Sequence, residues 1–350
     1  MDPSRFTAAL LSPAVDTPNV GDDLIEEAVR RLLDDDVDSC RFSIRRPLTD
    51  EEIAAVNDCD VALVCGTNLY QEDWHSALTP ESVDRITVPI VPVGVGSSAA
   101  SLQDIDVSVE TRQMIRAFHS RCVTGGVRDP HSAQVVARAG VDNAILTGCP
   151  VLFWSQQESL PEASDVPRRR LVLTARNWLM HRWPDAVNHP TQIELLRRIL
   201  EAFAGTEIVF SIHEDWDEQL VETLSIPRES VFRSSSPADY VDLYTNPENV
   251  VFAMRLHAGM LAFGNGVPTL FVGHDTRTYS FCQMMGLPYI ELFDESCADA
   301  CIASLERLLA GEWEVPREAG ERYRELHAAM GAFLRANMLP QRTAEARSGA

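Results

Sequence analysis

The chain has 350 residues, of which 45% are hydrophobic and 23% charged, a composition that excludes a largely disordered protein. Its length is sufficient for two hydrophobic cores, because single cores stop growing near ~250–300 residues. The formal net charge of −22 argues against a nucleic-acid partner, since a phosphate backbone would be repelled over most of the surface.

The sequence carries no membrane or secretion signal. No run approaches the ~18–20 apolar residues that cross a bilayer, and the N-terminal MDPSRFTAALLSPAVDTP has acid and proline where a signal peptide has a basic start. We therefore predict a cytoplasmic protein without a transmembrane segment. All 30 basic residues are Arg, so an anion site must use Arg, His or backbone N–H groups.

Short β-rich runs alternate with amphipathic helical patterns, which is typical of parallel sheets covered by helices. In the first half, the predicted strands are Phe6–Ser12, Cys40–Arg45, Asp60–Cys65, Ile90–Val95, Cys122–Val127 and Asn143–Leu146. The helices predicted between them are Gly21–Leu33, Asp50–Asn57, Ser108–Phe118 and Pro130–Ala139.

After a polar, Pro-containing stretch at 155–169, the same alternation restarts. The predicted strands are Leu171–Thr174, Glu207–Ile212, Val250–Met254, Thr269–Val272 and Tyr289–Glu291. The predicted helices are Thr191–Phe203, Asp215–Leu224, Pro237–Tyr244, His257–Phe263, Tyr279–Met285, Ala298–Leu309 and a final one near Arg317–Ala336.

These two series predict an α/β protein with two Rossmann-like domains that face each other across a cleft. The predicted domains are residues 1–154 and 170–336, joined by a linker at 155–169 and followed by a polar tail at 337–350. In open α/β sheets, ligands bind outside the carboxyl ends of the strands, so polar residues at those ends are the candidates for function.

Several turns in the first half combine Gly with polar residues at strand ends. Gly21, between Asn19 and Asp22, allows a close approach of backbone to a ligand at a helix start, and Asp22 either caps that helix or contacts a sugar hydroxyl. Asn68 follows the third predicted strand, and 94–98 is a Gly/Ser loop of the kind that cradles phosphate. Tight βα turns also require Gly, so each loop alone is weak evidence.

Arg128 and Asp129 stand at the end of the fifth predicted strand. Two interpretations remain open: a structural salt bridge that fixes the turn, or an Arg128 presented to an acidic ligand while Asp129 caps the following helix.

The eight cysteines include no CxxC pair and are predicted to be small buried hydrophobic residues in a reducing compartment. Cys149 has no basic neighbour in sequence to lower its pKa, which disfavours a catalytic thiol. Cys297 and Cys301 could hold a metal only with partners from elsewhere, and we predict no metal site.

The second half has the more specific signal. Arg255 and His257 are two residues apart where a predicted strand runs into a helix, so both can project from one strand end. Arg offers a two-pronged fork for a carboxylate or phosphate, and His suits proton transfer near neutral pH. Either residue alone would more often be structural, but the pair favours function.

A second polar cluster, with His274 and Arg277, follows the next strand, so Arg277 can share the same anion. The alternative is a solvated polar turn. Arg176 and His213, with Asp217 nearby, are lesser candidates at two other strand ends, and His213 is equally typical of an ordinary polar loop.

Together these residues resemble the polysaccharide pyruvyl transferase family. The resemblance extends from about Val15 to Tyr289, and Arg255-Leu256-His257 is its most specific part. One departure is Arg277, where the family often has Lys. The other matching segments are Asn19-Val20-Gly21-Asp22, Gly66, Gly94-Val95-Gly96, Val127-Arg128-Asp129 with Ser132, Gly148-Cys149-Pro150, Gly266-Val267-Pro268, Asp275 and Met285-Gly286-Leu287.

The resemblance implies a glycosyltransferase-B-like (GT-B-like) fold and transfer of the enolpyruvyl unit of phosphoenolpyruvate to two sugar hydroxyls, which gives a cyclic ketal and phosphate. The implied reaction needs no cofactor, only phosphoenolpyruvate as co-substrate. Arg255 and His257 fall on the family's donor-binding and catalytic positions. We further expect Arg277, Arg128 and His274 on the donor side, and Asn19, Asp22, Asn68, His213 and Asp217 on the acceptor side.

Two other functions remain open. One is a nucleotide-sugar glycosyltransferase on the same fold, with Glu291 or Asp294 holding the ribose; the other is a non-catalytic saccharide-binding relative. The expected partners are a saccharide acceptor and a small anionic donor, and a homo-oligomer is compatible with the sequence.

Overall fold

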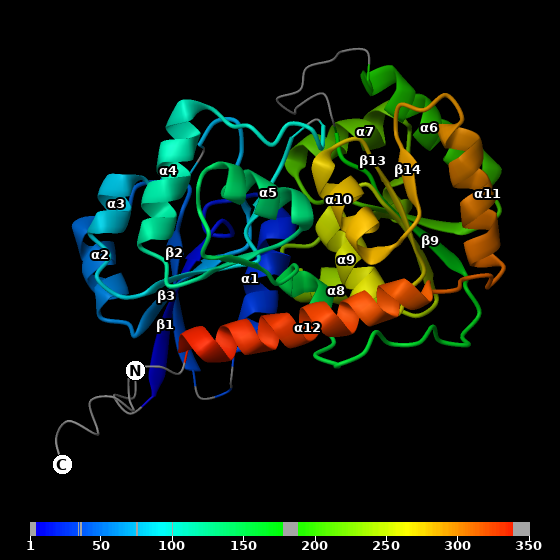
Figure 1. Cartoon of the computed structure of the whole chain (residues 1–350). Helices are drawn as coiled ribbons and strands as arrows, with labels where there is room; N and C mark the ends of the chain where they lie inside the picture. Colours follow the sequence, from blue (N-terminus) through cyan, green and yellow to red (C-terminus); the bar gives the residue numbers. More distant parts are fainter. Residues whose placement is uncertain are drawn as a thin grey trace. The chain divides into compact units, whose positions relative to one another are not determined.

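The computed structural model describes residues 5–33, 35, 37–74, 76–99, 101–177 and 188–338 (Figure 1). Its contacts divide the chain into two compact units. Unit 1 comprises residues 1–17, 25–150 and 322–350, and unit 2 comprises residues 18–24 and 151–321. The first turn of the helix after the first strand therefore belongs to unit 2, although the rest of that helix belongs to unit 1.

Unit 1 is built on a parallel sheet of order β2-β1-β3-β5. Buried side chains of one sheet face pack against α2, α3 and α4, and isolated bridges from Ile90 to Cys122 and from Val95 to Val127 extend the sheet. Its strands are β1 Phe6–Ser12, β2 Val37–Ser43, β3 Val61–Cys65, β4 Asn68–Tyr70, β5 Ile90–Val93, β6 Gly96–Ser97, β7 Gly125–Val127 and β8 Ala144–Leu146. The helices that carry residues of unit 1 are α1 Val20–Leu32, α2 Asp50–Asn57, α3 Pro80–Asp84, α4 Val109–Ser120, α5 Pro130–Arg138 and α12 Arg317–Met338.

Unit 2 contains a six-stranded parallel sheet of order β11-β10-β9-β12-β13-β14. From β9 the chain adds strands in one direction and then returns to add β12, β13 and β14 in the other, so the order reverses between β9 and β12. The strands are β9 Arg170–Thr174, β10 Glu207–Ser211, β11 Val231–Phe232, β12 Asn249–Ala253, β13 Thr269–Gly273 and β14 Tyr289–Glu291. The helices are α6 Asn188–Ala202, α7 Glu218–Thr223, α8 Pro237–Thr245, α9 Leu256–Gly264, α10 Thr276–Met285 and α11 Cys297–Leu309.

Most of the longer predicted elements are confirmed within a few residues, and β1 and α2 have the predicted bounds. Thr49 and Glu52 explain the sharp start of α2, because each side chain accepts the other's backbone N–H in a capping box. The predicted helix Asp215–Leu224 is a 3₁₀ turn at Asp215–Asp217 followed by the short α7. The elements that the sequence did not predict, β4, β6, β11 and α3, have two to five residues, too few for a periodic pattern.

The last helix differs from the predicted domain layout. Residues 322–338 of α12 group with unit 1, because Asn337 accepts a hydrogen bond from Thr124 at 3.0 Å and the Phe333 ring lies beside Gly126. Asn337, predicted as the start of a polar tail, is buried, and the tail from residue 339 lies outside the described residues. The stretch 155–169 forms neither helix nor strand. Among the described residues, no helix is long and apolar enough to cross a membrane.

Helix α9 carries the Arg-Leu-His segment and is buried along almost its whole length, which explains why its composition is apolar on every face. Gly259 permits this packing, since a Cβ there would lie 2.5 Å from Cε1 of Phe271 and 2.8 Å from Cβ of Ala253. Gly264 is packed against the backbone of Leu152, which cannot move aside as a side-chain tip can.

We expect Gly264→Ala to destabilise the protein by about 1–3 kcal/mol, because the added methyl group would overlap the Leu152 carbonyl group. Gly205→Ala is the matched control, as a Cβ at Gly205 would meet no atom within 4 Å. Urea unfolding followed by circular dichroism measures both variants. Equal midpoints for the two would contradict this packing argument.

Candidate functional site

The candidate site lies at the carboxyl ends of the unit 2 strands. Arg176 follows β9 and Arg255 follows β12, so these two residues flank the position where the strand order reverses. That position is where open α/β sheets bind ligands. The turns after β10 and β13 add His213 and His274 to the same edge of the sheet.

Arg255 is held by two carboxylates. Its Nη1 donates to Oε1 of Glu214 at 2.8 Å, and its Nη2 donates to Oδ2 of Asp217 at 2.5 Å. The Arg255 side chain is only 8% exposed. Burial acts to lower the pKa of Arg255, but Asp217 and Glu214 outweigh it and raise that pKa. The guanidinium group is therefore fixed in orientation and fully charged.

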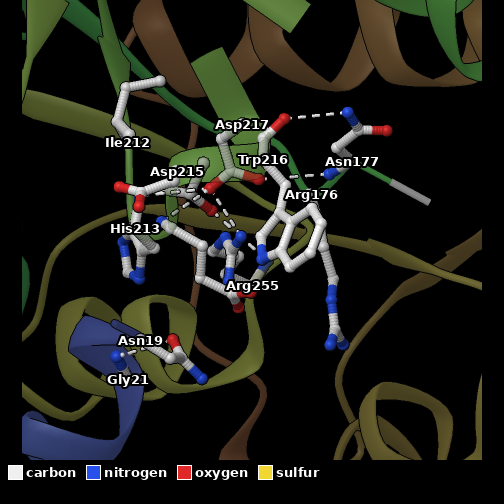
Figure 2. A network of polar contacts seen from close by, with 12 residues as sticks. Asn19, Gly21, Arg176, Asn177, Ile212, His213, Asp215, Trp216, Asp217 and Arg255 are labelled. Carbon is white, nitrogen blue, oxygen red and sulfur yellow. Dashed lines mark hydrogen bonds and ion pairs between the residues drawn. The ribbon is translucent and has the colours of Figure 1, made fainter. Parts of the chain in front are cut away.

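Asp217 organises the turn after β10. Its Oδ1 accepts the backbone N–H of Asn177, and its Oδ2 accepts the backbone N–H groups of His213 and Glu214 as well as Nη2 of Arg255 (Figure 2). The side chain is 1% exposed. Asp217, predicted as an acceptor contact, thus has both carboxylate oxygens engaged within the protein, and its position suits it to orient Arg255.

His213, another predicted acceptor contact, is buried and bonded to its own unit. Its Nε2 lies 2.5 Å from the hydroxyl of Tyr244, which is 2.7 Å from Oγ of Ser211. Burial lowers the pKa of His213 well below its ordinary value, and Arg255 and His257 lower it further. His213 is therefore an uncharged structural group at neutral pH.

The turn after β13 forms a second arginine–carboxylate pair. Asp275 caps α10 by accepting the backbone N–H groups of Arg277 and Thr278, and it also accepts Nε of Arg277 at 2.8 Å. Burial raises the pKa of Asp275, but Arg277 and Arg176 outweigh this and hold it at about 2. The partly exposed Arg277 therefore carries a positive charge at the edge of the site.

Arg176 is partly buried near two other arginines. Burial lowers its pKa to about 9, and the neighbouring Arg277 and Arg255 act in the same direction, against Glu214 and Asp275. Its backbone carbonyl accepts a hydrogen bond from Gln192. A bound anion would relieve this repulsion, so Arg176, Arg255 and Arg277 together form a cationic cluster suited to a carboxylate or phosphate.

His257 lies in the first turn of α9 and is half-buried. Residues 18–24 belong to the same unit, and the Val20 N–H donates to the His213 carbonyl at 3.3 Å. A Cβ at Gly21 would lie 3.2 Å from Nδ1 of His257 and 3.2 Å from Oδ1 of Asn19. The absence of a side chain at Gly21 thus lets the imidazole and the Asn19 amide pack against the start of α1, where Asp22 is buried.

Arg128 and Asn68 lie in unit 1, where they bind each other. Arg128 Nη1 donates to Oδ1 of Asn68 at 3.0 Å, Nη2 donates to the Ser97 carbonyl at 2.9 Å, and Nε donates to Asp129 at 2.9 Å. Asp129 in turn caps α5 by accepting the Ser132 N–H. With a side chain 2% exposed and its guanidinium packed over Gly96, Arg128 has the geometry of the structural alternative rather than of an exposed ligand contact.

The structure therefore brings together Arg255, His257, His274 and Arg277 with Asn19 and Asp22 in unit 2, and it groups Arg128 with Asn68 in unit 1. Sequence reasoning missed Glu214 and Asn177. Each is adjacent to a residue already singled out, His213 and Arg176, so the strand-end position was the available signal.

The model of the polysaccharide pyruvyl transferase family matches residues 19–276, which confirms the resemblance found in the sequence. No curated protein sequence matches the chain. Among solved structures, MnaA of S. aureus, determined with UDP, is 10% identical with a TM-score of 0.59, covering 96% of this chain and 98% of that one.

Two further structures have the same likeness. The UDP-N-acetylglucosamine 2-epimerase of Rickettsia bellii is 12% identical with a TM-score of 0.55 and 99% coverage of both chains. The UDP-GlcNAc 2-epimerase of Neisseria meningitidis, bound to UDP-GlcNAc, is 12% identical with a TM-score of 0.53, covering 95% of this chain and 98% of that one. At such identities the likeness shows the fold alone, and it confirms the predicted GT-B-like class.

The pKa of His274 predicts part of the acid sensitivity. Burial lowers this pKa from 6.5 to about 4; Asp275 opposes the shift, and Arg277 and Arg176 reinforce it. Because the folded state favours the neutral imidazole, His274 contributes stability that is complete above pH 6.5 and is lost as the pH falls towards 4. Between pH 7 and 4, we expect the free energy of unfolding to fall by on the order of 2 kcal/mol less in His274→Gln than in the wild-type protein. Urea unfolding at several pH values measures this difference. Identical pH profiles for the two proteins would contradict the assignment.

Proposed function

The chain belongs to the polysaccharide pyruvyl transferase family, and on that premise we propose that it transfers the enolpyruvyl unit of phosphoenolpyruvate to two hydroxyl groups of a saccharide, with release of phosphate. The observation that carries this proposal is the cationic cluster of Arg176, Arg255 and Arg277 in a protein of net charge −22. Such a local concentration of guanidinium groups suits a small ligand with a carboxylate and a phosphate.

Arg255 is our main donor-binding residue. Two carboxylates hold its guanidinium group before any ligand arrives, so little side-chain entropy is lost on binding. Arg277 and Arg176 supply further positive charge, and the N-terminal N–H groups of α9 and α10 favour negative charge nearby. His274, uncharged at neutral pH, would serve as a neutral hydrogen-bonding group.

We assign proton transfer to His257. In the proposed reaction, C3 of the enol gains a proton while one sugar hydroxyl forms a bond to C2 and gives up its proton. The second hydroxyl then forms the other C–O bond as the C–O bond to phosphate breaks, and its proton leaves with the phosphate. An imidazole can accept and donate these protons near neutral pH.

The acceptor saccharide is assigned to the side of His257 formed by residues 18–24. Asn19 and Asp22 remain our acceptor candidates, because Asn19 lies beside the imidazole and Asp22 is in the same helical turn. His213 and Asp217 are better assigned to holding this surface in place, since Asp217 accepts the backbone N–H of His213 and Nη2 of Arg255.

A nucleotide-sugar glycosyltransferase is the second candidate, because two of the similar structures were determined with UDP or UDP-GlcNAc. In such an enzyme, Glu291 or Asp294 would hold the ribose of the nucleotide. Asp294 accepts the backbone N–H of Ser296 at 2.8 Å, and Glu291 accepts the hydroxyl of Tyr289 at 2.9 Å. Incubation with phosphoenolpyruvate and mixed saccharides tests the first function by phosphate release and the mass of the product. UDP release from UDP-sugars, without phosphate release, would favour the second.

We expect His257→Ala to lower turnover by ~10²–10⁴-fold, because that is the usual contribution of a general acid–base group. The donor KM should change little, since the arginine cluster is intact. His327→Ala, on α12 in unit 1, controls for the loss of a histidine and should leave turnover unchanged. Steady-state phosphate release measures both variants, and an unchanged rate in His257→Ala would remove this residue from the mechanism.

A further inference from the structure

We propose that Glu214 is a resident carboxylate, one that occupies Arg255 in the ligand-free protein and is displaced when the anionic donor binds. Glu214 would then set the affinity and selectivity of the site for anions. This inference rests on the proposed function, because it assigns the incoming group to the donor of that reaction.

The two carboxylates on Arg255 differ in how firmly they are held. Asp217 accepts three backbone N–H groups in addition to Arg255, and its side chain is 1% exposed. Glu214 reaches Nη1 of Arg255 at 2.8 Å from a longer side chain that is 15% exposed, and it shares a capping box with Asp217 at the start of the 3₁₀ turn. Asp217 is thus a fixed anchor, whereas Glu214 stands on the accessible side of the guanidinium group.

All three arginines of the cationic cluster act electrostatically on Glu214. Burial raises its pKa, but Arg255, Arg176 and Arg277 all act to lower it, and the net pKa is lowered. Its carboxylate therefore senses the same three guanidinium groups that a bound carboxylate or phosphate would. In this respect Glu214 imitates the ligand that the cluster is proposed to bind.

An exchange of carboxylates suits the energetics of a buried guanidinium group. A buried polar group that lacks a hydrogen-bond partner is costly, so an Arg255 whose Nη2 is bonded to Asp217 but whose Nη1 is not bonded would destabilise the ligand-free protein. Glu214 removes that cost, and a donor carboxylate or phosphate can take over its charge-assisted hydrogen bond. Asp217 keeps the guanidinium oriented throughout. Glu214 therefore makes the site selective for anions, because uncharged molecules cannot displace its carboxylate from Arg255 and weakly basic anions displace it poorly.

The test compares three isosteric variants: Glu214→Gln, Asp217→Asn and Asp215→Asn. Glu214→Gln removes the competing charge and should lower the KM and Kd for phosphoenolpyruvate about tenfold. Asp217→Asn weakens the anchor and should raise both by a similar factor. Asp215→Asn removes the same charge one residue from Glu214, but Asp215 pairs with Arg233, so it should leave both constants unchanged.

Steady-state kinetics and isothermal titration calorimetry with phosphoenolpyruvate measure these constants, and thermal unfolding verifies that each variant is folded. If Glu214→Gln does not fold, Glu214→Asp replaces it, because its shorter, still charged side chain should also lower KM, by a smaller factor. A raised KM in the Glu214 variant would show that Glu214 positions Arg255 as Asp217 does, and would overturn the inference. An equal decrease of KM and Kd in Asp215→Asn would also overturn it, because the effect would then come from general charge repulsion.

A failure of the proposed function is distinguishable from a failure of this inference. If the wild-type protein neither binds nor converts phosphoenolpyruvate, the proposed function fails. Inorganic phosphate then remains as the probe of the cluster, and tighter phosphate binding by Glu214→Gln than by wild type and Asp215→Asn would still support a resident carboxylate. No difference between the three proteins would reject it.

Discussion

The ion pair between Asp217 and Arg255 is the contact on which the candidate site depends. Asp217 joins three segments that are distant in sequence: the turn after β9 through Asn177, the turn after β10 through His213, and the end of β12 through Arg255. Because His257 lies in the first turn of α9, two residues after Arg255, the same contact also influences where the imidazole stands. Asp217 therefore acts on the residues to which we assign donor binding and proton transfer, while its own side chain is buried.

The acidic composition makes this arrangement more informative than it would be in a basic protein. With no lysine and a net charge of −22, an anionic ligand meets a repulsive surface over most of the molecule. Burial is the main cause of the lowered pKa of Arg176, and the neighbouring Arg277 and Arg255 lower it further, which the carboxylates of Glu214 and Asp275 only partly offset. Strongly perturbed pKa values of this kind are concentrated at functional sites.

The sequence was sufficient for the fold class and for placing Arg255 and His257 where a strand runs into a helix, because strand periodicity and position relative to a strand end are local properties. The sequence was insufficient to predict which side chains form hydrogen bonds with each other across long sequence separations. Arg128 and Asn68 are 60 residues apart, and only the folded chain shows that the side chain of one donates a hydrogen bond to that of the other. The grouping of residues 322–338 with unit 1 likewise depends on Thr124, more than 200 residues away from its partner Asn337.

Arg128 and Arg255 show why the environment of an arginine decides its role. Both follow a buried strand and both pair with a carboxylate, but Arg128 pairs with the adjacent Asp129, whereas the partners of Arg255 come from the turn after β10. Arg128 has Nε, Nη1 and Nη2 bonded to neighbours, and its guanidinium is packed over Gly96, where any side chain would collide with it. Arg255 has one fixed partner and one on the accessible side, beside two more arginines. The first arrangement fits a role in stabilising a turn, whereas the second has a partner that our proposal exchanges for a ligand, which is the physical requirement for binding an anion reversibly.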